Sequence, residues 1–122
     1  NDEEEVAVVA KIVTQSALYN VTIGRTVRLE CKVSPANGVV VQWTRNNTNY
    51  FIGTQKSYEQ DLSSYSAGDR FSIAANSTDL LIRDVRPSDS GLYTCEVLQV
   101  DPVKIQHNLA ILESPRIVSK YF

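Results

Sequence analysis

The sequence predicts an all-β fold, either a sandwich of two packed sheets or a barrel, and three observations lead to this prediction. The chain of 122 residues contains 15 valines, 8 isoleucines and 8 threonines, and β-branched residues favour strands. Its apolar runs are short and are separated by Gly, Asn, Asp, Ser and Pro at spacings of about 8–12 residues, which is typical of sandwiches and barrels. No long segment shows the apolar periodicity of an amphipathic helix.

The length corresponds to one domain. The net charge is −2, from 12 Lys+Arg and 14 Asp+Glu. Four of the acids lie in the run 2–5, and the remaining 12 basic and 10 acidic residues give a balance of +2. Such a near-neutral body lacks the basic surface that nucleic-acid binding requires. No apolar stretch is long enough to span a membrane. We therefore expect neither nucleic-acid binding nor direct membrane insertion.

Two cysteines, Cys31 and Cys95, each lie in a stretch of alternating apolar and polar residues. In both stretches the cysteine falls on the apolar side, so we expect both to point into the core. Two inward cysteines on packed sheets can form a disulfide, which would stabilise the fold by about 4 kcal/mol. Such a bond indicates an oxidising compartment. The alternative is a pair of buried free thiols.

Trp43 and the run before Cys95 add a more specific pattern. Trp43 lies 12 positions after Cys31, and the run 89–95, DSGLYTC, has the form Asp-x-Gly-x-Tyr-x-Cys. Together these features resemble the immunoglobulin superfamily over residues 12–113. The resemblance implies a two-sheet sandwich with a Cys31–Cys95 disulfide between the sheets and the Trp43 indole packed on it.

The same resemblance assigns roles within the motif. Tyr93 is expected to form a tyrosine corner, its hydroxyl bonding back to the preceding turn, and Gly91 allows a tight turn into the strand. The 26 residues between Trp43 and Arg70 leave room for the additional strands C′ and C″ of a variable-type (V-type) domain. In such domains an Arg at the start of strand D commonly pairs with the motif Asp, which implies an Arg70–Asp89 ion pair. Two separate solvated charges are the alternative.

The strands are expected in the order of a V-type domain. Asn37-Gly38 is interpreted as the turn between B and C, and Asp101-Pro102 as the turn between F and G. Segment 103–113 has no glycine, whereas antigen-receptor variable domains carry a Gly-x-Gly bulge in strand G, so this group is disfavoured. The expected ranges are A and A′ within 7–23, B at 25–33, C at 38–45, C′ at 49–53, C″ near 56–61, D at 70–75, E at 78–83, F at 91–99 and G at 103–113.

A narrower similarity is to the first domains of neural adhesion proteins, the group that includes the IgLONs, Lachesin and the Dpr and DIP families. The shared features are the start IVTQ at 12–15, Gly24 before strand B, and the exit ESPRIV at 113–118. The resemblance implies three segments. They are an acidic N-terminal segment with the start of strand A (1–11), the V-type domain (12–113), and a linker or start of a following immunoglobulin domain (114–122). A frayed tail is the alternative for the last segment.

No residue pattern indicates catalysis. The one histidine, His107, has no second His or free Cys to join it in a metal site or catalytic set, and no phosphate loop or paired-carboxylate motif is present. We therefore expect no enzyme, no catalytic residue, no metal and no cofactor, and we interpret His107 as a structural or interface residue. Three sequons predict N-glycosylation of a secretory protein, at Asn20, Asn46 and Asn76.

Binding is expected on the outer face of the sheet made of strands G, F, C, C′ and C″, which the first domain of this group uses. Strand alternation from inward Trp43 and Cys95 predicts which side chains point outward. An apolar patch ringed by polar groups is typical of an interface. The predicted face consists of Val40, Gln42, Thr44, Tyr50, Phe51, Ile52, Glu96, Leu98, Val100 and Gln106, with Thr94 also outward.

The resemblance implies an extracellular recognition or adhesion domain at the cell surface, in the nervous system, within a membrane- or lipid-anchored protein. Its partner would be an immunoglobulin-superfamily cell-surface protein, either a related chain or a second copy in a homodimer through the G-F-C-C′ sheet. The alternative function is ligand binding by the V-type domain of an immune-type receptor or of a secreted immunoglobulin protein.

Overall fold

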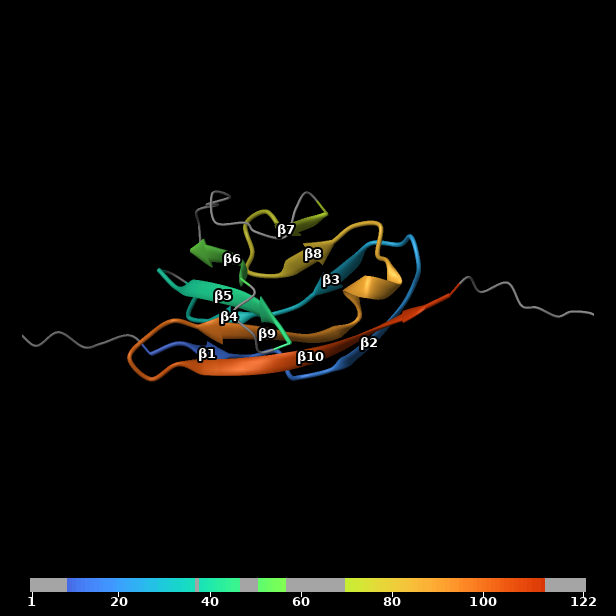
Figure 1. Cartoon of the computed structure of the whole chain (residues 1–122). Helices are drawn as coiled ribbons and strands as arrows, with labels where there is room; N and C mark the ends of the chain where they lie inside the picture. Colours follow the sequence, from blue (N-terminus) through green and yellow to red (C-terminus); the bar gives the residue numbers. More distant parts are fainter. Residues whose placement is uncertain (1–8, 37, 47–50, 57–69, 114–122) are drawn as a thin grey trace, which may run out of the picture.

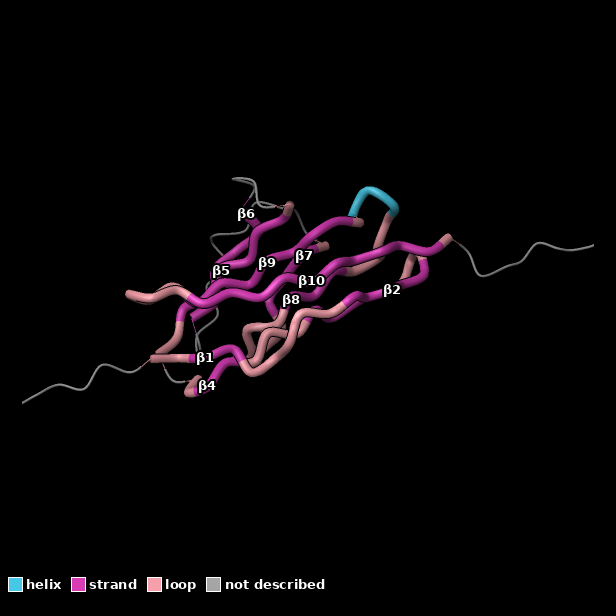
Figure 2. The backbone as a smooth tube through the Cα atoms, turned by 90° about the horizontal axis from the view of Figure 1, so that it is seen from below, coloured by secondary structure: helices cyan, strands magenta, loops and turns pink. Residues whose placement is uncertain are grey.

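The computed structural model describes residues 9–36, 38–46, 51–56 and 70–113, with only the backbone described for 51–56. These residues form a sandwich of two main layers (Figures 1 and 2). One layer is a five-stranded sheet in the order β2-β10-β9-β5-β6, and the other contains a three-stranded sheet in the order β3-β8-β7. The bounds are β2 Leu18–Thr22, β3 Val27–Leu29, β5 Val40–Arg45, β6 Phe51–Lys56, β7 Phe71–Ile73, β8 Leu80–Ile82, β9 Gly91–Val97 and β10 Val103–Leu112.

The start of the domain divides between the two layers. Strand β1 (Lys11–Ile12) pairs antiparallel with β4 (Val33–Ser34), whereas β2 pairs in parallel with β10. The Gln99 side chain fixes β1 near the loop between β9 and β10, because its amide both accepts from the Ala10 N–H (3.0 Å) and donates to the Ala10 carbonyl (3.1 Å). This arrangement corresponds to the A and A′ strands expected within 7–23.

His107 holds the crossover between β1 and β2 against the core. Its ring is fully buried. Nδ1 accepts from the Ala17 N–H at 3.1 Å, and Nε2 lies 2.7 Å from the Glu30 carbonyl oxygen. A backbone N–H can only donate and a carbonyl can only accept, so the ring is neutral with its proton on Nε2. The Tyr19 ring packs edge-on against it at 5.0 Å. His107 is thus a core residue of this fold.

The core lies between the two layers and follows from strand alternation. Leu29 on β3, Leu80 and Ile82 on β8, and Val41 and Trp43 on β5 are all fully buried. Their neighbours along each strand are more exposed, as in a sheet with one face on the core. The all-β sandwich predicted from the sequence is confirmed.

The strand bounds differ from the expected ones in the middle of the chain. The C′ strand is β6 at 51–56, later than the expected 49–53, and it contains a register irregularity opposite Trp43 and Thr44. The expected range 25–33 for strand B is divided into β3 and β4. The expected D and E strands are shorter, and residues 57–61 of the expected C″ lie outside the described part of the chain.

Gly91 begins β9 with φ of 146°, a backbone conformation that side chains rarely adopt. A Cβ added there would lie 2.7 Å from Oδ1 of Asn46. That oxygen accepts from the Leu92 N–H at 2.9 Å, so it is held in place. The glycine in the DSGLYTC motif is therefore required for backbone conformation and for this close approach.

We expect Gly91→Ala to lower the free energy of unfolding by about 2–3 kcal/mol, because it combines backbone strain with a clash. Chemical denaturation measures the change. The matched control is Gly24→Ala, where φ is 88° but no atom lies within 4 Å of the added Cβ, so only the strain of about 1 kcal/mol remains. Equal losses in the two variants would show that the Asn46 contact is unimportant.

Candidate binding face

The two layers of the sandwich behind the candidate face are linked at Cys31. Its disulfide to Cys95 has an S–S distance of 2.08 Å and a Cα–Cα distance of 6.5 Å, which confirms the predicted bond. Trp43 pairs directly with Cys95 in the register of β5 and β9. The Trp43 indole N–H donates to the Thr78 carbonyl at 2.9 Å. The indole is therefore held at both layers of the sandwich.

Side chains replace strand pairing around Cys31. Between β3 and β4, the Cys31 N–H donates to Oδ1 of Asp79 at 2.7 Å, and the Thr78 hydroxyl donates to the Cys31 carbonyl at 2.6 Å. Asp79 is fully buried and also accepts from Arg28 (2.7 Å) and Lys32 (2.8 Å). This explains why the expected strand B is interrupted. The backbone N–H groups of residues 30–32 all donate to side-chain oxygens and not to a neighbouring strand.

The charge of Asp79 is retained despite burial. Burial alone raises the pKa of this carboxyl, but hydrogen bonds from Lys32, the Cys31 N–H and Arg28 more than offset it, so the pKa lies below its ordinary value. The roles of Asp79 and Thr78 in holding Cys31 were not predicted from the sequence. The available signal was an acidic residue just before an apolar strand, together with two basic residues four positions apart, Arg28 on the adjacent strand and Lys32 just after it.

The predicted tyrosine corner and the Arg70–Asp89 ion pair lie together at the end of the sandwich where β9 begins. The Tyr93 hydroxyl donates to the Asp89 carbonyl at 2.6 Å. Asp89, within the 3-10 helix η2 (Pro87–Asp89), accepts two hydrogen bonds from Arg70, at 2.7 and 3.0 Å. The Arg86 N–H donates to the same carboxylate at 2.8 Å.

The Asp89 carboxylate is buried, and its charge is balanced by hydrogen bonds from Arg70 and from the Arg86 N–H. Burial raises the pKa of Asp89, but the hydrogen bonds from Arg70 and Arg86 and the charges of Arg70 and Arg45 outweigh it, so the pKa lies below its ordinary value. The hydrogen bond with Asp89 in turn raises the pKa of Arg70. Charge-assisted bidentate contacts of this kind are stronger than neutral hydrogen bonds.

The outer face of the five-stranded sheet consists of cross-strand rows. In one row Gln42 pairs with Glu96, which pairs with Lys104. In the next, Thr44 pairs with Thr94, which pairs with Gln106. These side chains are half-buried, except for exposed Lys104 and for Thr94, which is only 4% exposed. Thr94 lies on the outer face as expected from alternation, but its side chain is covered and not presented to solvent, and Gln106 donates to its hydroxyl at 3.4 Å.

The apolar residues of the predicted face gather at one end of the sheet. The Leu98 N–H donates to the Val40 carbonyl at 2.9 Å, so these two residues are adjacent. Leu98 is 43% exposed and Val40 is half-buried. Val100, in the loop between β9 and β10, is 97% exposed. This end of the sheet is therefore apolar, and the rows beside it are polar.

Among the described C′ residues of the predicted face, Phe51 lies away from this apolar end. Val40 pairs with Lys56, whereas Phe51 pairs with Thr44 at the far end of β5. Val40 and Thr44 are four positions apart along the strand, which is about 13 Å at 3.3 Å per residue. Ile52 lies at the register irregularity of β6, and Tyr50 lies outside the described residues. The backbone register therefore does not place Phe51 beside Val40.

The three sequon asparagines are exposed and lie in different places. Asn20 is on β2, Asn46 follows β5 with φ of 57°, and Asn76 lies between β7 and β8 with φ of 56°.

Among the described residues, no group of three or more His, Cys, Asp or Glu side chains could hold a metal ion. Within the same part of the chain, no helix is long and apolar enough to cross a membrane.

Comparisons with known proteins agree with this architecture. The sequence model of the immunoglobulin V-set domain matches residues 14–112. The chain belongs to the immunoglobulin V-set family, whose domains are generally binding modules and not enzymes. A search of curated protein sequences found no match.

Three solved structures illustrate the similarity in fold. A crystal structure of Dpr1 IG1 bound to DIP-eta IG1 gives a TM-score of 0.71 at 21% identity, over 86% of this chain and 97% of that chain. DIP-gamma IG1+IG2 gives 0.71 at 19% identity, over 89% of this chain and 51% of that one. The ZIG-8 IG1 homodimer gives 0.67 at 21% identity, over 85% and 84%.

The Arg70–Asp89 pair predicts a specific dependence of stability on pH. Because the pKa of Asp89 is lowered in the folded state, its contribution is present above about pH 4 and is lost as the pH falls through the folded-state pKa. We expect Arg70→Met to cost about 3 kcal/mol at pH 7, since it leaves a buried carboxylate without its cation. The difference from wild type should narrow at pH 3, where the variant carboxyl is protonated.

Thermal melting between pH 3 and pH 7 checks this prediction. The control is Arg86→Met, which removes a partner of Asp84 at 3.4 Å in a pair whose side chains are both more than half exposed. That change should cost less than about 1 kcal/mol at every pH. A difference between Arg70→Met and wild type that stays constant with pH would contradict the assignment.

Proposed function

We propose that the chain is an extracellular recognition or adhesion domain that binds another immunoglobulin-superfamily protein at the cell surface, in the nervous system. The surface that carries this proposal is the outer face of the five-stranded sheet. Half-exposed Leu98 beside Val40, with Val100 projecting from the adjacent loop, forms its apolar end. Half-buried Gln42, Glu96 and Gln106 supply polar groups next to it. An apolar centre with polar surroundings is the composition of protein interfaces.

Solved structures of the same fold support the choice of partner. Dpr1 IG1 is bound to DIP-eta IG1, and ZIG-8 IG1 forms a homodimer. The first is a pair of different immunoglobulin domains and the second a pair of identical ones. We propose that the partner of this chain is of the same class, either a related protein or a second copy. Weak binding of single domains is then amplified between cells by multivalency.

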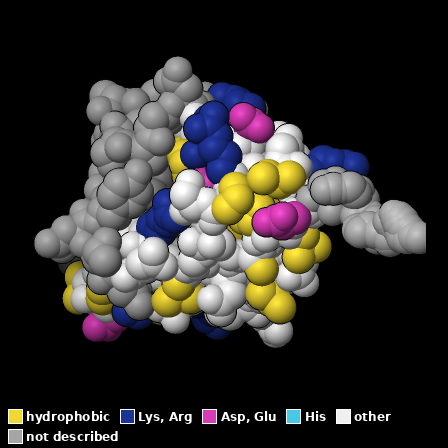
Figure 3. All heavy atoms as spheres, turned by 45° about the vertical axis from the view of Figure 1, so that its right-hand side comes forward, with side chains coloured by type: hydrophobic (Ala, Val, Ile, Leu, Met, Phe, Trp, Pro, Cys, Tyr) yellow, Lys and Arg dark blue, Asp and Glu magenta, His cyan; other side chains and the backbone are white. Residues whose placement is uncertain are grey.

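A second apolar surface fits the proposed continuation into another immunoglobulin domain through 114–122. Ile23 and Leu112 are exposed at the end of β2 and β10, where the Ile23 N–H donates to the Leu112 carbonyl at 2.8 Å. Figure 3 shows apolar side chains gathered on this end of the molecule. DIP-gamma IG1+IG2, about half of which this chain covers, continues into such a domain. The full-length protein is proposed to be anchored to the membrane directly or by a lipid.

The test of the binding face is Leu98→Asp. The side chain is exposed in the free domain, so the charge stays solvated and stability should change little. At the centre of an interface the same carboxylate would be buried without a partner. We expect binding to weaken by about 2–4 kcal/mol, the size of a hot-spot loss. Sedimentation measures self-association, and a binding screen against tagged immunoglobulin ectodomains measures association with related proteins.

The neighbouring Val97→Asp is the control, because Val97 is only 1% exposed. It should destabilise the domain or prevent secretion, since it buries an unpaired charge. Normal melting and full binding of Leu98→Asp would place the function on another face. A wild-type domain that binds only a non-immunoglobulin ligand in the screen would favour the alternative, an immune-type receptor or a secreted immunoglobulin protein.

A further inference from the structure

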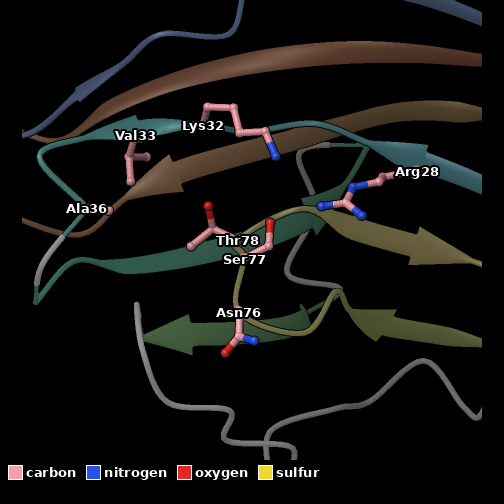
Figure 4. A pocket seen from close by; sticks show the side chains of 7 residues that line it. All are labelled: Arg28, Lys32, Val33, Ala36, Asn76, Ser77 and Thr78. Atoms are coloured by element: carbon pink, nitrogen blue, oxygen red, sulfur yellow. The ribbon is translucent and has the colours of Figure 1, made fainter.

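A cavity of about 450 Å³ lies in the layer opposite the proposed binding face. Figure 4 shows Lys32, Val33 and Ala36 along one side, Ser77 and Thr78 across from them, Asn76 beyond and Arg28 at one end. Its volume falls in the range of about 300–1,000 Å³ that is typical of sites for small organic molecules. None of its residues belongs to the proposed face.

One lining residue, Asn76, is also the acceptor of a sequon, Asn76-Ser77-Thr78. It is exposed at a turn, where a bulky attachment is accommodated. The two following residues are held in place: the Ser77 hydroxyl oxygen accepts from the Asp79 N–H at 3.0 Å, and the Thr78 hydroxyl donates to the Cys31 carbonyl. The attachment point is therefore fixed relative to the cavity.

We propose that Asn76 carries an N-linked glycan and that the first sugars of this glycan occupy the cavity. In the attachment, the Asn76 Nδ2 loses one proton and forms a bond to the anomeric carbon of the first sugar. The bond from that carbon to the diphosphate of a lipid-linked oligosaccharide donor breaks, and the lipid diphosphate leaves with the electron pair. No oxidant or reductant is involved.

The lining suits a saccharide. Val33 and Ala36 present apolar groups to the C–H faces of a sugar ring. Lys32 and Arg28 each give one N–H to the buried carboxylate of Asp79, at 2.8 and 2.7 Å. A lysine ammonium has three donors and an arginine five, so both retain donors for sugar hydroxyls and for the N-acetyl carbonyl. Asp79 thus orients two donors over the cavity while it binds Cys31.

This inference is independent of the proposed function. A glycan held on the layer that contains β3, β8 and β7 leaves the five-stranded sheet free. It also adds contacts that exist only in the folded state. It therefore predicts that the glycan at Asn76 stabilises the domain, and that glycans at the other two sequons do so much less.

The experiment uses secreted protein with all three sequons intact, with site occupancy measured by mass spectrometry. Thermal melting is compared before and after complete enzymatic deglycosylation, and after trimming to the first sugar. We expect complete removal to lower the melting temperature by about 4 °C or more, and trimming to retain most of the stabilisation. Asn20→Gln is the control that removes a glycan from β2, and it should leave the melting temperature within about 1 °C of wild type.

A second variant separates sugar contacts from effects of Asn76 itself. Ala36 is exposed, so Ala36→Tyr should fold and fill the cavity. In deglycosylated protein it should melt like wild type, whereas in glycosylated protein it should remove most of the glycan-dependent stabilisation. An unoccupied Asn76, an unchanged melting temperature after deglycosylation, or the same glycan-dependent shift in Ala36→Tyr would each overturn the proposal.

Discussion

The fold depends on how Cys31 is held. Its sulfur is bonded to Cys95 in the five-stranded sheet, its N–H is bound by the buried Asp79 carboxylate, and its carbonyl is bound by the Thr78 hydroxyl. The Thr78 carbonyl in turn receives the Trp43 indole N–H. These covalent and polar contacts therefore meet in the segment between β3 and β4, which belongs to neither strand. A buried polar network of this kind specifies a unique core only when every member is satisfied.

A sandwich closed from within leaves its outer faces available for function. The tyrosine corner and the Arg70–Asp89 pair close the end of the sandwich at η2. At the start of the domain, Gln99 binds Ala10 beside β1, and His107 binds Ala17 just before β2. Leu98 and Val100 remain exposed although they flank this interior. The stability of the domain and the chemistry of its outer surface are thereby separable.

The sandwich, the disulfide and the V-type class could be predicted because they depend on residues whose spacing is visible: Cys31, Trp43 and the DSGLYTC run. A structural role for His107 was among the expectations, but its partners and the role of Asp79 could not be predicted, because they depend on the position of backbone groups far away in the sequence. The register of β6 was also beyond prediction, since pairing with β5 places Lys56 opposite Val40 and Phe51 opposite Thr44, with an irregularity at Ile52 that strand alternation does not anticipate. Alternation identifies outward residues but does not reveal that Thr94 is covered by its neighbours.

Amide hydrogen exchange at Cys31 tests most directly whether side-chain hydrogen bonds, and not a strand ladder, hold the segment between β3 and β4. Cys31 belongs to neither β3 nor β4, so an ordinary connecting segment would exchange quickly there. The account predicts that the Cys31 N–H exchanges as slowly as that of Cys95 in wild-type protein, and much faster in Asp79→Ala. Fast exchange at Cys31 in the wild type, or slow exchange that survives Asp79→Ala, would contradict it.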